Sequence, residues 1–191
     1  HDEDGDVRLD AIHSLRRMGS VEGVTVLQSD QLTMLHFLLA EENVRIRRAV
    51  QHLLKEVRHP DLVALRGTTA CLIANIHRYP EDFEEVLAAL ARIGLHHASL
   101  CELMVEFVLN FDRRFLIKER TVSDREYVAS LVMLLSAARV NKRIIDALPA
   151  FCAKHVEYLK HMYSYLFESK EEVIVKNDAS QHASSSGGVT A

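Results

Sequence analysis

Histidine is the residue type in this sequence best suited to chemistry, because there are eleven histidines and an imidazole can bind a metal or carry a proton near neutral pH. His96 and His97 precede Cys101 and have the composition of metal ligands. A structural zinc site needs a full set of converging ligands, so we interpret the two histidines as capping a helix start or lying in solvent. His155 and His161 do not share a helix face well and are expected on the surface. We predict no metal site.

The sequence lacks the motifs of several common enzyme classes. The sequence contains no Gly-rich phosphate loop, no Gly-x-Ser-x-Gly and no His-Glu-x-x-His, which are the patterns that position a phosphate, a nucleophile or a catalytic zinc. We therefore assign no catalytic, cofactor-binding or metal-binding residue, and we predict that the chain is not an enzyme and uses no cofactor.

Cationic side chains gather in one short stretch of the sequence. They offer a candidate interaction face for an anionic partner, such as an acidic protein segment or a phosphate-rich ligand; the alternative is a set of contacts between repeats beside a solvated surface. The residues are Arg45, Arg47, Arg48, Lys55 and Arg58. A second candidate contact site is the charged and apolar segment 113–118, which could also fold back on its own domain.

Overall charge and composition limit the class of protein. The net charge of −4 and the pI near 6.3 disfavour direct nucleic-acid binding, which usually needs a basic bias. The three cysteines are far apart within apolar helical patterns, and we expect them to be reduced and buried. No run of about 18 apolar residues predicts a membrane span. The chain begins with His1 rather than Met, so we expect a piece of a longer protein.

Apolar residues recur at helical spacing along most of the chain. Val7, Ala11, Leu15 and Met18, for example, follow one another at intervals of three and four, which predicts one buried helical stripe. Gly19 is expected to end this helix, and Ser29, Asn43, Pro60 and Ser123 are expected to open later ones. The spacing predicts eight helices, over residues 6–18, 30–40, 44–57, 60–78, 81–94, 97–110, 123–141 and 149–167.

Composition divides the chain into two parts. Residues 1–168 hold the helical patterns, whereas 169–191 are increasingly rich in Ser, Asn, Gln and Gly, and from Lys176 onward contain almost no large apolar residue. Such a segment cannot bury enough apolar surface to fold by itself. We predict a disordered tail or linker there.

One pattern repeats within the helical part. Val7-Arg8 is followed about 39 residues later by Ile46-Arg47, within the period of HEAT repeats. The aliphatic residue would pack inward and the arginine would reach a carboxylate of a neighbouring repeat. We expect Arg47 to reach back to Asp6 or Asp10, and Arg8 to lack its partner because its own preceding repeat lies outside this chain. The predicted fold is an all-α, HEAT/armadillo-like α-solenoid of about four helical hairpins.

Several short segments, in the same order and with similar gaps, resemble the Integrator complex subunit 4 family, which includes a plant relative that interacts with SHORT-ROOT. They cover most of residues 4–168 and are Val7–Arg17, Ser29–Leu32, Ile46–Leu54, His77–Pro80, Gly94–His97, Tyr127–Ala138 and His155–Lys160.

The resemblance implies a nuclear, non-catalytic scaffold. The family's subunit holds the paired nuclease-fold subunits of the Integrator complex, which cut small nuclear RNA and nascent transcripts. The family also binds an inositol polyphosphate, for which no motif in this sequence places a site. Two other functions remain open: a HEAT-repeat adaptor in trafficking or transport, and an RNA-binding protein that uses the basic face.

Overall fold

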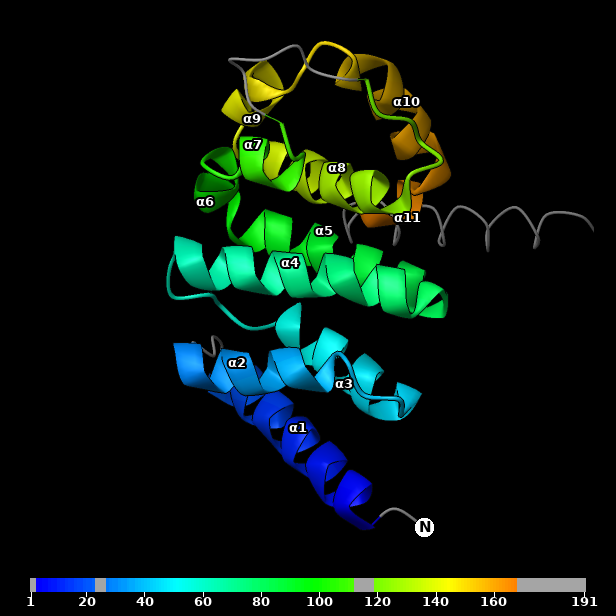
Figure 1. The fold of residues 1–191 in the computed structure, drawn as a ribbon. Helices are drawn as coiled ribbons and strands as arrows, with labels where there is room; N and C mark the ends of the chain where they lie inside the picture. The colour runs from blue at the N-terminus through cyan, green and yellow to red at the C-terminus, as the bar shows by residue number, and fades with distance from the viewer. Residues whose placement is uncertain (1–2, 23–26, 112–118, 168–191) are drawn as a thin grey trace, which may run out of the picture.

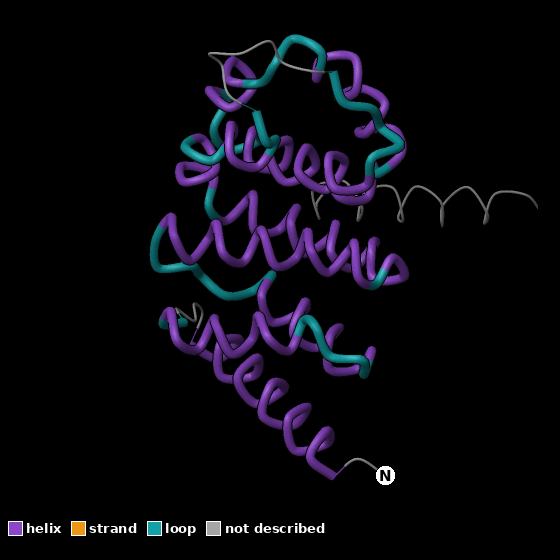
Figure 2. Tube along the Cα trace, viewed as in Figure 1, coloured by secondary structure: helices purple, strands orange, loops and turns teal. Residues whose placement is uncertain are grey.

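The computed structural model describes residues 3–22, 27–111 and 119–167, and within these ranges every regular element is helical (Figure 2). The predicted all-α fold is therefore confirmed. The elements are α1 (Glu3–Glu22), α2 (Ser29–Leu38), α3 (Val44–Leu54), α4 (Leu62–Arg78), the 3₁₀ turn η1 (Pro80–Asp82), α5 (Phe83–His96), α6 (Ala98–Glu102), α7 (Val105–Val108), α8 (Arg125–Ala138), α9 (Arg143–Ala147), α10 (Cys152–Met162) and α11 (Ser164–Phe167).

The helices are stacked in tiers, as Figure 1 shows. Helix α3 packs on α1, α5 packs on α3 and α8 packs on α5, which forms one layer. Helices α2 and α4 lie beside them in a second layer, and α4 also contacts α8. The hairpins α2–α3 and α4–α5 are regular, and shorter helices complete the stack at the C-terminal end. This arrangement is the predicted α-solenoid.

Helix α8 is the centre of the hydrophobic core. Every residue from Tyr127 to Ala138 is buried, because α5 lies on one side of the helix and α4, α6, α9 and α10 contact others. A helix that is apolar around its whole circumference is expected in such a position. Among the described residues, no helix is both long and apolar enough to span a bilayer.

Three predicted helix starts are displaced by one or two residues, and one is correct. Asn43 caps α3 as expected, with its side chain accepting from the Arg45 backbone N–H at 3.0 Å. Pro60 was expected in the first turn of the next helix, but Asp61 is the cap and accepts from the Ala64 N–H at 2.8 Å. A carboxylate satisfies an open N–H of the first turn, which proline cannot do.

The same shift occurs at two other starts. Gln28, not Ser29, precedes the first turn of α2, and its backbone N–H donates to the Gln31 side chain at 2.9 Å. Asp124, not Ser123, caps α8 and accepts from two backbone N–H groups at 3.1 Å. In each case the side chain that satisfies the open backbone groups lies beside the residue expected from the pattern.

Helix ends also differ from the prediction. Helix α1 continues through Gly19 to Glu22, and α5 continues through Gly94 to His96. The helix expected over 97–110 is divided into α6 and α7, and the one over 149–167 into α10 and α11, with α9 as an additional short helix. The predicted tail, 169–191, and the candidate contact segment, 113–118, lie outside the described residues.

Arginine side chains connect consecutive tiers, but in the direction opposite to the predicted one. Arg47 does not reach Asp6 or Asp10; it contacts Asp82 at 2.6 Å and Glu81 at 3.0 Å, in the following tier. Arg45 lies about 200° away around α3 and faces the preceding tier, with Asp6 at 3.6 Å, whereas Arg47 faces the start of α5. The interaction therefore runs forward along the stack.

Arg8 has a partner too, which corrects the expectation that it lacks one. Its Nη1 lies 2.7 Å from the Glu41 carboxylate, in the connection between α2 and α3. This pair is partly exposed, whereas the Arg47–Asp82 pair is almost completely buried. The residues before the two arginines also differ, since Ile46 is buried as predicted whereas Val7 is 69% exposed.

Candidate protein-binding groove

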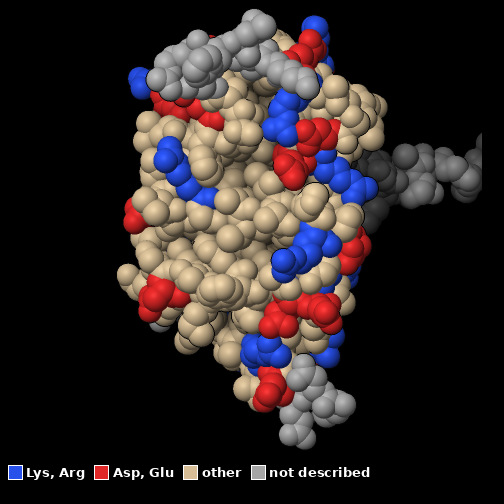
Figure 3. Space-filling model, in the orientation of Figure 1, with Lys and Arg blue, Asp and Glu red and all other residues tan. Residues whose placement is uncertain are grey.

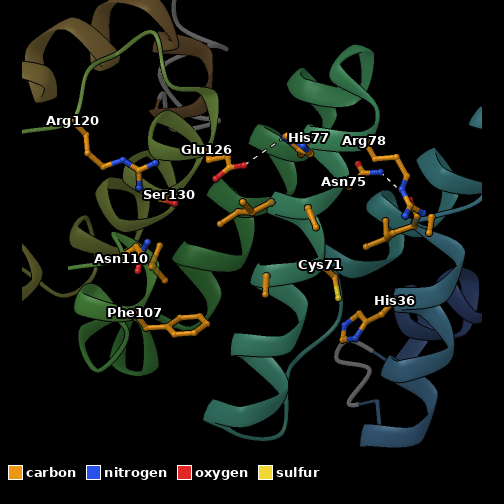
Figure 4. Close-up of a pocket in the computed structure, with 16 residues that line it drawn as sticks. His36, Cys71, Asn75, His77, Arg78, Phe107, Asn110, Arg120, Glu126 and Ser130 are labelled. Atoms are coloured by element: carbon orange, nitrogen blue, oxygen red, sulfur yellow. Dashed lines mark hydrogen bonds and ion pairs between the residues drawn. The ribbon is translucent and has the colours of Figure 1, made fainter. Parts of the chain in front are cut away.

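A groove of about 680 Å³ crosses the face of the stack formed by α2, α4, α7 and the start of α8. Figure 3 shows this face as a hollowed area of uncharged residues with charged side chains at its edges. Figure 4 shows His36 and Cys71 at one end and Phe107 and Asn110 across from them. The lining residues are His36, Leu39, Ala40, Ala70, Cys71, Ile73, Ala74, Asn75, His77, Arg78, Phe107, Val108, Asn110, Arg120, Glu126 and Ser130.

The outward face of α4 forms the floor of this groove. Two exposed positions in the middle of the helix, Ala70 and Ala74, carry only methyl groups, so this part of α4 lies low between its neighbours. Phe107 on α7 rises beside it with 46% of its surface exposed. A hollow with small residues on its floor and an aromatic ring on its wall is well suited to hold apolar side chains of another molecule.

The polar groups of the groove are mostly engaged. Asn75 donates to the Leu39 carbonyl at 2.9 Å and accepts from Gln51 at 2.8 Å. Glu126 lies 4.0 Å from His77, as the dashed line in Figure 4 marks. Arg120 pairs with Asp124, which lowers the pKa of that carboxyl because the hydrogen bond and charge of Arg120 outweigh the effect of burial. These contacts shape the groove without filling it.

The five residues of the predicted basic face do not line the groove, and they do not share one surface. Arg47 is buried in its ion pairs. Arg58 donates to the His96 carbonyl at 2.5 Å, and Arg45 lies 3.6 Å from Asp6. Arg48 is exposed and Lys55 is half-buried. Binding of an anionic partner there stays a prediction for the accessible members, and Arg47 is excluded from it by burial.

Three of the histidines, His36, His59 and His97, form a largely buried cluster that sequence analysis did not predict. His97 stands at the start of α6, as expected, but it is only 8% exposed rather than solvated, and its Nε2 lies 3.3 Å from His59 Nδ1. The hydroxyl of Thr68 lies 3.0 Å from His59 Nε2 and 2.9 Å from His36 Nε2. This chain of contacts connects α2, the start of α4 and the junction of α5 with α6.

No metal position follows from this cluster. Across the described ranges, no group of three or more His, Cys, Asp and Glu side chains has the geometry to hold a metal ion. Sequence reasoning missed His36 and His59, because their partners are 32 and 38 residues away and no local motif joins them. The cluster acts as polar packing between tiers.

His155 is the second histidine that the structure places differently. It was expected on the surface, but it is half-buried and its Nδ1 lies 2.8 Å from the Tyr127 hydroxyl. The same hydroxyl donates to Cys152 at 3.5 Å, which helps to hold α10 against α8. His161 is exposed, as predicted.

The cysteines are free, as expected, but they differ in accessibility. Cys101 and Cys152 are fully buried, whereas Cys71 is half-buried in the groove. Burial raises the pKa of all three thiols, to about 12 for Cys101. A thiol that keeps its proton at neutral pH is a weak nucleophile, so these side chains serve packing.

Acid is expected to destabilise the protein through the histidine cluster. Burial, with the charges of His97, His36 and His96, lowers the pKa of His59 to about 3, and burial beside Arg92, Arg58 and His97 lowers that of His96 to about 4. Below pH 6.5 the unfolded chain binds protons that the folded chain does not, so stability is complete above about pH 6.5 and declines toward pH 3. His59 alone should account for a loss of about 2 kcal/mol between pH 7.5 and pH 5.

Urea melts at pH 7.5 and pH 5 test this prediction. His59→Gln should reduce the difference in unfolding free energy between the two pH values, whereas the exposed His161→Gln should leave it unchanged. Equal pH dependence in the wild type and His59→Gln would show that the cluster is not the cause.

The chain has relatives in several organisms. It is 30% identical over 167 residues to the Integrator complex subunit 4 homolog of Dictyostelium discoideum, a match that covers 87% of this chain. It is also 29% identical over 181 residues to Integrator complex subunit 4 of Mus musculus, which covers 91% of the chain. The chain is related in sequence to the Integrator complex subunit 4 family.

The relationship extends to a plant protein and covers one segment of each relative. Protein SIEL of Arabidopsis thaliana is 25% identical over 151 residues, or 75% of this chain. The matches cover 13%, 17% and 15% of the slime-mould, mouse and plant relatives. No protein-family model matches the chain. The predicted resemblance to Integrator complex subunit 4 is thereby confirmed.

Proposed function

We propose that this chain is a protein-binding, non-catalytic helical scaffold of an Integrator-like complex, and that it works in the nucleus. The observation that supports this function best is the match to Integrator complex subunit 4 proteins over most of the chain, from slime mould to mammals. By resemblance, its partners are the nuclease-fold subunits that cut small nuclear RNA and nascent transcripts.

The chemistry of the described residues supports a scaffold. The cysteines have raised pKa values, and the buried histidines are engaged with Thr68 and with one another. The groove on the α2–α4–α8 face has a mainly apolar surface rather than a cluster of acids and bases. Buried polar side chains that serve only packing, together with an apolar groove, are typical of a binding surface rather than of a catalytic site.

Affinity purification from nuclear extract tests the proposed function. The tagged chain should enrich Integrator subunits, with the nuclease-fold pair among them, when the bound proteins are quantified by mass spectrometry. Arg47→Asp is the matched control, because a second carboxylate beside the buried Asp82 should unfold the chain.

Three outcomes are distinguishable. Enrichment of Integrator subunits by the wild type and not by Arg47→Asp supports the proposal. Equal enrichment by both would indicate non-specific capture and contradict it. Enrichment of coat or transport-receptor proteins instead would replace it with the trafficking adaptor.

A further inference from the structure

The shape of the groove fits one kind of occupant. Ala70 and Ala74 leave the middle of α4 without long side chains, while Phe107 stands beside them. Two helices approach to about 8–10 Å when the residues between them are small. A third helix could therefore lie along α4, with its apolar side chains between α4 and α7.

Backbone hydrogen bonding favours a helix over an extended peptide. The groove is lined by side chains of helices, whose backbone groups are already paired within each helix, and no described residue offers a strand edge. An extended peptide would bury backbone N–H and C=O groups against Ala70, Ile73 and Val108 without partners, which is unfavourable. A helix satisfies its own backbone groups and presents only side chains.

Two arginines of α4 give the groove a positive bias. Arg78 lines it, and the guanidinium of Arg66 lies 5.1 Å from the centre of the Phe107 ring. Neither arginine has an ion pair with any residue in the described ranges, whereas Arg120 is neutralised by Asp124 and Glu126 faces His77. Twelve residues along one helix correspond to about 18 Å, so the two charges are well separated along α4, with Arg78 among the lining residues and Arg66 beside Phe107.

We propose that this groove binds an amphipathic α-helix of a partner protein, with an apolar face and carboxylates near both of its ends. This inference rests on the proposed scaffold function and specifies the chemistry of one partner. The apolar face would cover Ala70, Ala74 and Phe107, and the carboxylates would pair with Arg66 and Arg78. Charge complementarity of this kind selects the partner as well as strengthening the contact.

The direct test uses two synthetic helical peptides with blocked termini. Both carry leucine and alanine on one face; one has glutamates at its ends, and the other has lysines in the same places. Their affinities for the 191-residue chain are measured by fluorescence anisotropy. We expect the acidic peptide to bind about tenfold more tightly or better than the basic one.

Cysteine alkylation reports where the peptide binds. Cys71 lines the groove, and the other two cysteines are fully buried, so N-ethylmaleimide should modify Cys71 first. Saturating acidic peptide should slow this modification about fivefold or more, as followed by mass spectrometry, because the bound helix covers the thiol. Cys101 and Cys152 serve as internal controls for loss of structure.

Charge-reversal variants test whether Arg66 and Arg78 recognise the charge of the peptide. Arg66→Glu/Arg78→Glu should reverse the preference between the two peptides, with circular dichroism confirming that the variant is folded. The matched control, Arg48→Glu/Arg143→Glu, changes two exposed arginines outside the groove and should keep the preference for the acidic peptide.

Several results would overturn the inference. They are equal binding of both peptides, no binding of the acidic peptide, or an unchanged Cys71 alkylation rate. Loss of the preference for the acidic peptide in the Arg48→Glu/Arg143→Glu control would overturn it as well. If the acidic peptide fails while the chain still enriches Integrator subunits from nuclear extract, the groove assignment is wrong and the proposed function stands. If the peptide binds as expected but no Integrator subunit is enriched, the proposed function is wrong.

Discussion

Replacing Arg47 by methionine is expected to destabilise the protein by about 3–5 kcal/mol, the usual effect of removing one partner of a buried ion pair. The Asp82 carboxylate is completely buried, and Arg47 supplies its charged hydrogen bonds at 2.6 and 3.3 Å. Without the guanidinium, Gln51 is the one side chain of the described residues that still donates to this carboxylate, at 3.2 Å. Two carbonyls of the α2–α3 connection, from Glu41 and Glu42, lose a donor as well.

The environment of Arg47 explains why this effect should be large. Burial alone would lower the pKa of the guanidinium, but the hydrogen bond and charge of Asp82 and the charge of Glu81 raise it. The guanidinium also lies 3.6 Å from the centre of the Tyr79 ring, which adds a cation–π contact. Arg47 therefore holds α3, the α2–α3 connection and η1 together as a charged group.

Urea melts of two further variants complete the test. Arg8→Met removes a half-exposed pair and should cost at most about 1 kcal/mol. The double variant Arg47→Met/Asp82→Leu should recover much of the lost stability, because an apolar pair leaves no buried charge without a partner. Equal, small effects of Arg47→Met and Arg8→Met would mean that the buried pair does not stabilise the stack.

Local patterns in the sequence predicted the helices well. The stripe Leu32, Leu35 and Leu39 is buried as expected. The stripe predicted for α1 is wrong, because Val7 and Met18 are exposed and the helix instead buries Leu9 and Ile12. The Asn43 cap was correct. These features depend only on residues three or four positions apart, which a sequence displays directly.

Contacts between tiers were harder to predict. The Val-Arg and Ile-Arg pattern indicated that Arg47 contacts another repeat, but not whether that repeat precedes or follows it. The direction is set by the side of α3 on which the arginine lies and by the position of Asp82, 35 residues away. The His59–His97 contact was missed for the same reason, since it spans 38 residues.

The groove gave no signal in the sequence at all. Ala70 and Ala74 are ordinary helix formers there, and their significance appears only when α2 and α7 lie on either side of them. Arg66 likewise lies next to the groove only because α7 brings Phe107 beside α4. A binding surface assembled from several tiers of a solenoid follows from the stacking and not from a motif.

Gly94 is the residue whose sequence interpretation was furthest from its structural role. It was expected to end a helix, but α5 continues past it, and it lies where α5 packs on α8. A Cβ atom at this position would lie 2.2 Å from the Met133 carbonyl oxygen and 3.3 Å from the Ala137 nitrogen. These atoms belong to the backbone of a buried helix and cannot move aside without separating the two helices.

Gly94→Ala is therefore expected to destabilise the protein by about 3 kcal/mol or more, at the upper end of the range for overpacked cores. Gly67→Ala is the matched control, since its added Cβ would meet only the end of the His36 ring at 3.6 Å. Because alanine is the better helix former, Gly67→Ala should be neutral or stabilise by up to about 1 kcal/mol. The two substitutions are chemically identical, so opposite signs in urea melts would locate the constraint in the α5–α8 contact. A loss of less than about 1 kcal/mol in Gly94→Ala would mean that the two helices are less closely packed than the structure shows.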